Sequence, residues 1–99
     1  MTGTTVTSAD LDSRRRRLLF RAWHRGMREM DLALGTFCDR EIATMSDEEL
    51  DLFEALLAVD DRVLVKWVTG ETPVPAAFDT PIFSRIRAFD PDIFGAHRA

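Results

Sequence analysis

Cysteine and histidine, the side chains that most often anchor disulfides and metal ions, are scarce in this sequence of 99 residues. The single cysteine, Cys38, cannot form an intramolecular disulfide, which indicates a reducing compartment. The two histidines, His24 and His97, lie far apart, and no close-spaced pair of metal ligands is present. We therefore expect no structural metal ion.

Long apolar runs and an excess of positive charge are also missing. Apolar stretches such as residues 55–59 cover only a few positions, whereas a helix that spans a bilayer needs about 20. There are 13 lysines and arginines against 17 aspartates and glutamates, giving a net charge of −4. This balance argues against nucleic acid or an anionic membrane as the main partner. We expect neither nucleic-acid binding nor membrane insertion.

Signals for a leader sequence and for catalysis are equally weak. Residues 1–13 have no basic start and no central apolar run, so we expect a cytoplasmic protein without a secretory signal. None of the five glycines belongs to a GxGxxG loop. Cys38 lies in an apolar pattern and is predicted to be a core residue. His24, Glu29 and Asp31 could form a catalytic site only if they converged in a pocket. We expect no catalytic residues and no enzymatic activity.

Helical periodicity is the strongest pattern that the sequence does contain. Apolar residues recur at steps of three and four, which places them on one face of a helix. Five helices are predicted, between residues 12 and 24, 27 and 45, 46 and 60, 61 and 70, and 80 and 91. Their expected buried residues are Leu18, Leu19, Ala22 and Trp23; Met27, Met30, Leu34, Phe37 or Cys38, Ile42 and Met45; Leu50, Phe53 and Leu56 or Leu57; Val63, Leu64, Trp67 and Val68; and Ile82, Phe83, Ile86 and Phe89.

These segments predict an all-α fold, a small five-helix bundle that forms a single domain over residues 13–91. Residues 1–12 and 92–99 are predicted to be flexible tails. The β-branched residues of the fourth segment also fit a short strand, although no partner strand is evident. Residues 71–77 carry two prolines and are predicted to form an extended loop.

Glycines and capping residues indicate the helix boundaries. Gly26 interrupts the apolar pattern and is predicted to form a tight connection that can use a positive φ. Gly35 is predicted to mark a close helix crossing, and Gly70 to end the fourth helix. Ser46 and Glu49 have the spacing of a capping box. Either of the two aspartates that follow the third helix can cap the fourth.

Two groups of side chains could bind a ligand, but their positions favour a structural role. The four arginines at positions 14–17 fan around their helix, so a solvated surface is favoured over a contact with RNA or DNA. Trp23 and Trp67 each fall on an apolar face, which favours the core over a platform for a ligand.

The string RGMREMD packs four charges beside the junction of the first two helices. Glu29 and Asp31 fall in the first turn of the second helix, where they favour the positive end of its dipole, and simple capping is one interpretation. The density of charges around a glycine also makes a flat, hydrogen-bonding spot that another backbone can approach. We therefore predict a site that binds a protein partner, formed by Arg25, Gly26, Met27, Arg28, Glu29 and Asp31.

The same string follows a short arginine-rich helix and precedes the helix of Phe37, a helix start at Ser46-Asp47-Glu48-Glu49-Leu50, and a segment with Trp67 that leads into a proline loop. In this order, over residues 14–89, it resembles the succinate dehydrogenase flavinylation factors, small assembly factors of bacteria and mitochondria. The resemblance implies a five-helix bundle that binds the flavoprotein subunit of succinate dehydrogenase, and in some organisms that of fumarate reductase. It also implies that FAD belongs to the partner, whose own histidine attacks the flavin, and that this chain binds no cofactor stably.

The resemblance assigns Arg25, Gly26 and Glu29 to the family's RGxxE pattern, with the other residues of the predicted site as neighbours. Arg25 and Glu29 are expected to form charge-assisted hydrogen bonds across the interface. We expect a monomer when the partner is absent. The alternative is a small acidic module that neutralises or regulates some other protein, as an antitoxin does.

Overall fold

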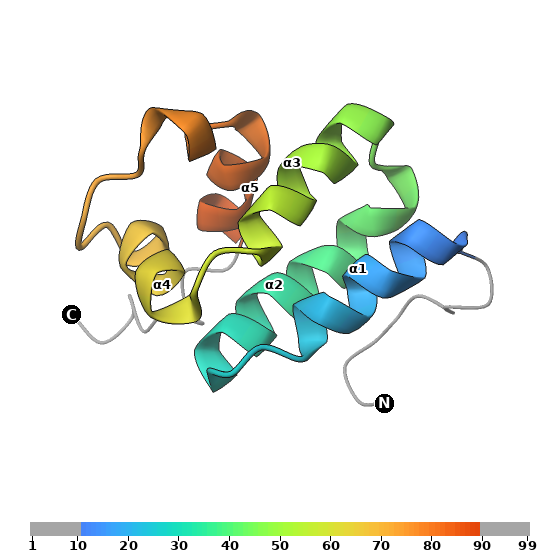
Figure 1. The fold of residues 1–99 in the computed structure, drawn as a ribbon, viewed down its shortest axis with the longest axis horizontal. Coiled ribbons are helices and arrows are strands. Elements are labelled where there is room, and N and C mark those ends of the chain that lie inside the picture. Colours follow the sequence, from blue (N-terminus) through green and yellow to red (C-terminus); the bar gives the residue numbers. More distant parts are fainter. Residues whose placement is uncertain (1–10, 90–99) are drawn as a thin grey trace.

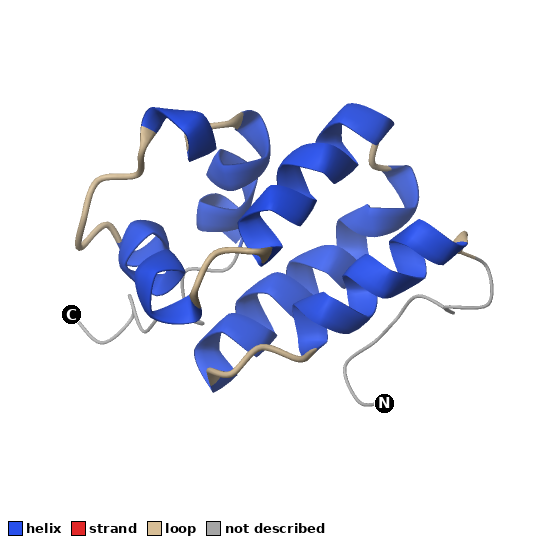
Figure 2. Ribbon diagram, viewed as in Figure 1, coloured by secondary structure: helices blue, strands red, loops and turns tan. Residues whose placement is uncertain are grey.

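The computed structural model describes residues 11–89, which form five α-helices and two short 3₁₀ turns. In chain order these are α1 (Ser13–Trp23), α2 (Arg28–Glu41), η2 (Ile42–Thr44), α3 (Asp47–Leu57), α4 (Asp61–Thr69), η3 (Ala76–Phe78) and α5 (Pro81–Phe89). Figure 2 shows only helices and loops in this part of the chain. The predicted all-α bundle is confirmed, and the alternative of a strand in the fourth segment is wrong because that segment is α4.

Residues 1–10 and 90–99, which hold most of the two predicted tails, lie outside the described residues, as do His97 and the end of the fifth helix at Pro91. Two residues of the predicted N-terminal tail are described. Leu11 is buried in the core, and Asp12 caps α1 by accepting a hydrogen bond from the backbone N–H of Arg15. These two residues therefore belong to the folded part of the chain.

The helices pack around one shared core (Figure 1). α1 and α2 run antiparallel, side by side, and α3 lies against α1. α5 contacts α2, α3 and α4, so it joins the first helices to α4. The connections between α1 and α2 and between α3 and α4 reach the same end of the molecule, which brings residues far apart in the sequence together there.

The predicted apolar faces supply the core. Most of the residues that were expected to be buried are buried, and they come from every helix. They are Leu18, Leu19, Ala22, Met30, Leu34, Phe37, Cys38, Ile42, Met45, Leu50, Phe53, Leu56, Leu57, Leu64, Trp67, Val68, Ile82, Phe83 and Ile86. Trp23 and Met27 are half-buried against them. Val63 was expected on the buried face but is 44% exposed, because it lies next to Leu64 and therefore about 100° around the helix from it. The side chain of Phe89 lies outside the description.

The predicted helix boundaries between residues 46 and 70 are confirmed. Ser46 Oγ accepts from the Glu49 N–H at 3.1 Å, and Glu49 Oε1 accepts from the Ser46 N–H at 2.9 Å, which completes the capping box of α3. Asp60 caps α4 by accepting from the Arg62 N–H at 2.8 Å. Gly70 ends α4 with a φ of 83°, the left-handed conformation that favours glycine.

The close helix crossing predicted at Gly35 is the contact between α1 and α2. A Cβ built on Gly35 would overlap the indole ring of Trp23, which lies directly over it. The Trp23 Nε1–H donates to Asp39 Oδ1 at 3.4 Å, which fixes the position of the ring. Glycine therefore allows the two helices to approach at this point.

We expect Gly35→Ala to destabilise the protein although alanine favours helix more than glycine does. The overlap with Trp23 should cost about 3 kcal/mol, as overpacked cores do, and the better helix propensity recovers about 1 kcal/mol. Urea denaturation should therefore show a loss of about 2 kcal/mol in the free energy of unfolding. A variant as stable as the wild type would show that Trp23 can move aside without cost.

The arginine run is less solvated than predicted. Arg14 Nη2 donates to Asp51 Oδ1 at 2.6 Å and to Glu54 Oε1 at 3.0 Å, both on α3. Arg15 donates to two backbone carbonyls between α2 and α3, at 2.9 and 2.5 Å. Half of the run thus fastens α1 to its neighbours, and tertiary contacts of this kind leave no periodic signal in the sequence.

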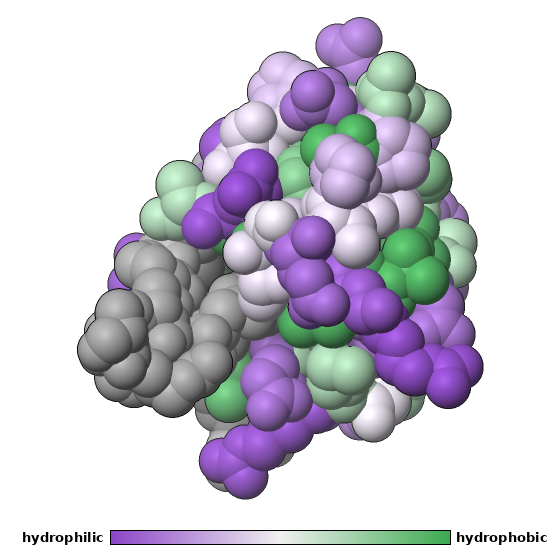
Figure 3. All heavy atoms as spheres, turned by 90° about the vertical axis from the view of Figure 1, so that its left-hand side faces the viewer, coloured by the Kyte–Doolittle hydropathy of each residue, from purple (hydrophilic) through white to green (hydrophobic). Residues whose placement is uncertain are grey.

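On the side that carries α4, hydrophilic residues separate small apolar patches (Figure 3). Three large hydrophobic residues are exposed, namely Phe20 by 58%, Val63 by 44% and Leu32 by 36%. Within residues 11–89, no helix combines the length and the apolar character needed to cross a membrane.

Candidate docking site

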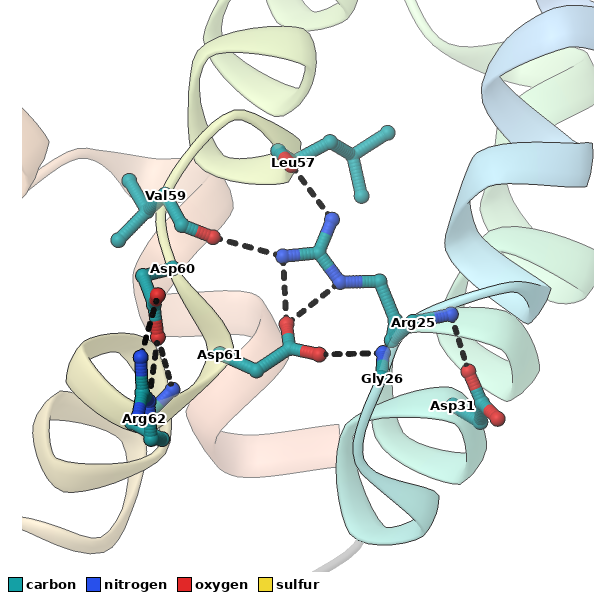
Figure 4. Close-up of polar contacts among 8 residues, drawn as sticks. All are labelled: Arg25, Gly26, Asp31, Leu57, Val59, Asp60, Asp61 and Arg62. Atoms are coloured by element: carbon teal, nitrogen blue, oxygen red, sulfur yellow. Dashed lines mark hydrogen bonds and ion pairs between the residues drawn. The ribbon is translucent and has the colours of Figure 1, made fainter.

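The guanidinium group of Arg25 joins the two connections at one end of the bundle (Figure 4). Its Nε donates to Asp61 Oδ1 at 2.6 Å, its Nη1 to the carbonyl of Leu57 at 2.5 Å, and its Nη2 to the carbonyl of Val59 at 2.7 Å. The side chains of Arg25 and Asp61 are only 9% and 12% exposed. The α1–α2 connection is therefore tied to the end of α3 and the start of α4 by a buried ion pair.

The backbone next to Arg25 is held from two directions. The Gly26 N–H donates to Asp61 Oδ2 at 2.9 Å, so both carboxylate oxygens of Asp61 bind the α1–α2 connection. The backbone N–H of Arg25 donates to Asp31 Oδ1 at 2.5 Å, from the first turn of α2. This arrangement, in which Arg25, Asp61 and Asp31 fix the position of Gly26, is called the Arg25 clamp below.

Gly26 itself is exposed, as a docking site requires, but it does not use the positive φ that a glycine allows. Its φ is not positive, and among the described glycines only Gly70 has a positive φ. A Cβ built on Gly26 would have Asp61 Oδ2 as its nearest neighbour, at 4.0 Å, which is an ordinary contact distance. The connection turns without a left-handed residue because the hydrogen bonds of the Arg25 clamp hold it. The structure therefore leaves open space at the surface of this glycine.

A shallow depression of about 430 Å³ lies between the two connections and is called the Gly26 groove. Its wall on the α4 side ends in an exposed pair, Asp60 and Arg62, whose side chains contact each other. Hydrogen bonds from Arg62 hold the pKa of the Asp60 carboxyl below its ordinary value, so the pair stays ionised in mildly acidic solution. The lining residues are His24, Arg25, Gly26, Met27, Val59, Asp60, Asp61 and Arg62.

The other predicted site residues surround the groove to different degrees. Arg28 and Glu29 are exposed, and their side chains form no hydrogen bond or ion pair with any residue in the described range. Met27 is half-buried, lines the groove and packs against the core. Asp31 is half-buried and engaged with the backbone of Arg25. Arg28 and Glu29 are thus two exposed charges close to Gly26 that no other residue of the range 11–89 binds.

The structure corrects the role expected for Arg25. Hydrogen bonds from Arg25 across an interface were predicted, but its guanidinium group points inward and is occupied by Asp61 and two carbonyls of this chain. The partner that the sequence analysis missed is Asp61, which was considered only as a helix cap. Its signal was the pair Asp60-Asp61: a helix needs one capping aspartate, Asp60 supplies the cap, and the second carboxylate needs another explanation.

The arrangement needed for an enzyme is not found in the described part of the chain. His24 lines the Gly26 groove, but Glu29 and Asp31 do not. Cys38 is fully buried, as predicted for a core residue, and its burial raises the pKa of the thiol well above the usual range, which disfavours the nucleophilic thiolate. No group of three or more histidine, cysteine, aspartate or glutamate residues within 11–89 is placed to hold a metal ion.

Comparisons with known proteins agree on one family. A protein-family model described as flavinator of succinate dehydrogenase matches residues 16–90. The FAD assembly factor SdhE of Acetobacter pasteurianus is 41% identical over 81 residues, which cover 82% of this chain and 74% of that protein. Two relatives are called succinate dehydrogenase assembly factor 2, mitochondrial. The one from Mycosarcoma maydis is 40% identical over 60 residues, and the one from Dictyostelium discoideum is 28% identical over 79 residues. The matches cover 61% and 80% of this chain but only 25% and 56% of those longer proteins.

Proposed function

The chain belongs to the family of succinate dehydrogenase flavinators, and from this membership we propose that it binds the flavoprotein subunit of succinate dehydrogenase and promotes covalent attachment of FAD. The flavoprotein subunit of fumarate reductase is a second partner of the same kind. In this proposal FAD is bound by the partner, and this chain holds no cofactor stably. It contributes binding energy and no catalytic group.

One observation supports this proposal above the others: Gly26 is exposed while its backbone is fixed by the Arg25 clamp. A surface that is already rigid loses little conformational entropy when a partner binds. The lack of a side chain at Gly26 allows the partner's backbone to approach closely, and the exposed charges of Arg28 and Glu29 lie beside the point of contact. The site thus has the properties of a protein-docking surface.

The geometry gives Arg25 and Glu29 different parts in the proposed complex. Glu29 is exposed, forms no ion pair within residues 11–89, and accepts hydrogen bonds from the partner in this proposal. Arg25 acts inside this chain by holding Gly26 in place. The cytoplasmic location and the monomeric state of the free chain stay predictions.

The proposed function predicts a loss of covalent flavin when this protein is absent. Cells that lack it should contain flavoprotein subunit with little covalently bound FAD, detected as reduced flavin fluorescence of that subunit on a denaturing gel. A copy of the gene for the wild-type chain should restore the signal. Equal fluorescence with and without the protein would contradict the proposal.

The rival function, an antitoxin-like or regulatory module, is distinguished by the bound partner. Purification of the tagged chain under mild conditions should recover the flavoprotein subunit. Recovery of a different protein, together with normal covalent flavin in the deletion strain, would favour the rival.

A further inference from the structure

The outward face of α1 carries the most exposed of the large hydrophobic side chains in the described structure. Phe20 is 58% exposed, and its ring stacks on the ring of His24 with centroids 3.8 Å apart and planes 17° apart. His24 Nδ1 lies 2.7 Å from the backbone carbonyl of Phe20, which fixes the second ring relative to the helix. Stacking on a held neighbour makes Phe20 a rigid apolar side chain on the surface, a property of residues that anchor protein interfaces.

Positive charge is concentrated around this ring. α1 contains five arginines and no acidic residue, in a chain whose net charge is −4. The two arginines at the start of the run are used within the fold, as shown above. The other three, Arg16, Arg17 and Arg21, surround Phe20 in a second depression of about 520 Å³, which Ser13 also lines.

The three arginines differ in how firmly they are held. Arg16 donates to the carbonyl of Leu11 at 2.7 Å, and Arg21 lies 3.7 Å from a carboxylate oxygen of Glu54. The side chain of Arg17 is exposed and has no hydrogen bond or ion pair with any other residue in the range 11–89. Arg17 is therefore the cation most available to an incoming group.

This surface is continuous with the proposed docking site. Positions 13, 17, 20 and 24 follow one another at helical steps of three and four, so they form one stripe along α1. The stripe ends at His24, which both stacks on Phe20 and lines the Gly26 groove. A polypeptide bound at the Gly26 groove can therefore extend along α1.

We propose that Arg16, Arg17, Phe20, Arg21 and His24, called the α1 ledge, bind an acidic segment of the flavoprotein partner that places an apolar side chain on Phe20. This inference rests on the proposed function and deepens it by naming a second contact surface and its chemistry. A protein segment fits better than nucleic acid or a membrane. The exposed rings of the ledge, Phe20 and His24, are stacked on each other, which leaves no row of separate rings for bases, and the whole chain is acidic.

Two surface variants test the ledge without disturbing the core. The affinity of the full chain for the purified flavoprotein subunit is measured by titration calorimetry at low and at high salt. Phe20→Ala and Arg17→Glu should each weaken binding by about tenfold. The wild-type affinity should fall as salt rises, and the fall should be smaller for Arg17→Glu because a charge contact has been removed.

Matched controls are available on α4, on residues that line neither depression. Val63→Ala shortens another exposed hydrophobic side chain, and Lys66→Glu reverses another exposed charge. Both should bind like the wild type, and circular dichroism should show that all four variants keep the helical fold. Wild-type affinity in either ledge variant would overturn the inference.

Two further outcomes separate the inference from the function on which it rests. If the wild-type chain itself does not bind the flavoprotein subunit, the proposed function fails. If Arg17→Glu loses binding only to an RNA oligonucleotide or to vesicles of anionic lipid, the ledge serves another class of partner and the inference fails alone.

Discussion

An arginine in place of Gly26 is expected to abolish binding of the flavoprotein subunit while the helical fold survives. Gly26 is exposed, its φ is not positive, and a Cβ there meets nothing closer than 4.0 Å. The added side chain therefore costs the folded chain little. It occupies the space that the partner's backbone must enter and adds a charge beside Arg28. Loss of a contact at the centre of an interface should weaken binding by at least about 30-fold.

Two comparison variants separate the effect of volume at this point from the effect of an added arginine. Gly26→Ala adds only a methyl group where there is room for it, so it should bind more tightly than Gly26→Arg. Ala43→Arg adds the same side chain at an exposed position in η2, beyond the opposite end of α2, and should bind normally. Affinity is measured by titration calorimetry and stability by thermal melting. Normal affinity of Gly26→Arg would remove Gly26 from the docking surface.

Local sequence patterns were sufficient to predict the helices because the interactions that define them are local. The capping box of Ser46 and Glu49 lies within one turn, and Gly70 ends α4 through its own φ. The apolar stripe was less informative in the short α4. A helix of two turns has too few residues to define a single apolar face, and Val63 was assigned to the wrong face.

The candidate site was predictable as a region but not in the direction of its side chains. The string at 25–31 predicted an accessible glycine with charges beside it, and the structure places Gly26, Arg28 and Glu29 at the surface. The inward turn of Arg25 depends on Asp61, which is 36 positions later in the sequence. Periodicity carries no information about such a pair. The sequence allowed a positive φ at Gly26, but long-range hydrogen bonds shape that turn and it does not use one.

Removal of the Arg25 guanidinium is expected to destabilise the whole fold, unlike the change at Gly26. Arg25→Ala leaves the carboxylate of Asp61 buried without its cation, and two backbone carbonyls lose their donors. Breaking a buried ion pair in this way costs about 3–5 kcal/mol. The melting temperature should fall by at least about 12 °C for a domain of this size. Urea denaturation and thermal melting of the purified variant measure both quantities.

The neighbouring surface pair provides the control for this prediction. Arg62 is 84% exposed and contacts Asp60, so Arg62→Ala should unfold at nearly the same urea concentration and temperature as the wild type. Arg25→Lys keeps the charge but cannot reach one carboxylate and two carbonyls at once, so it should recover only part of the lost stability. If Arg25→Ala melted like the wild type and lost only its affinity for the flavoprotein subunit, Arg25 would contact the partner after all. With the expected result, Arg25 supports the fold and Gly26 leaves the surface open, so the two residues of the motif have separable roles.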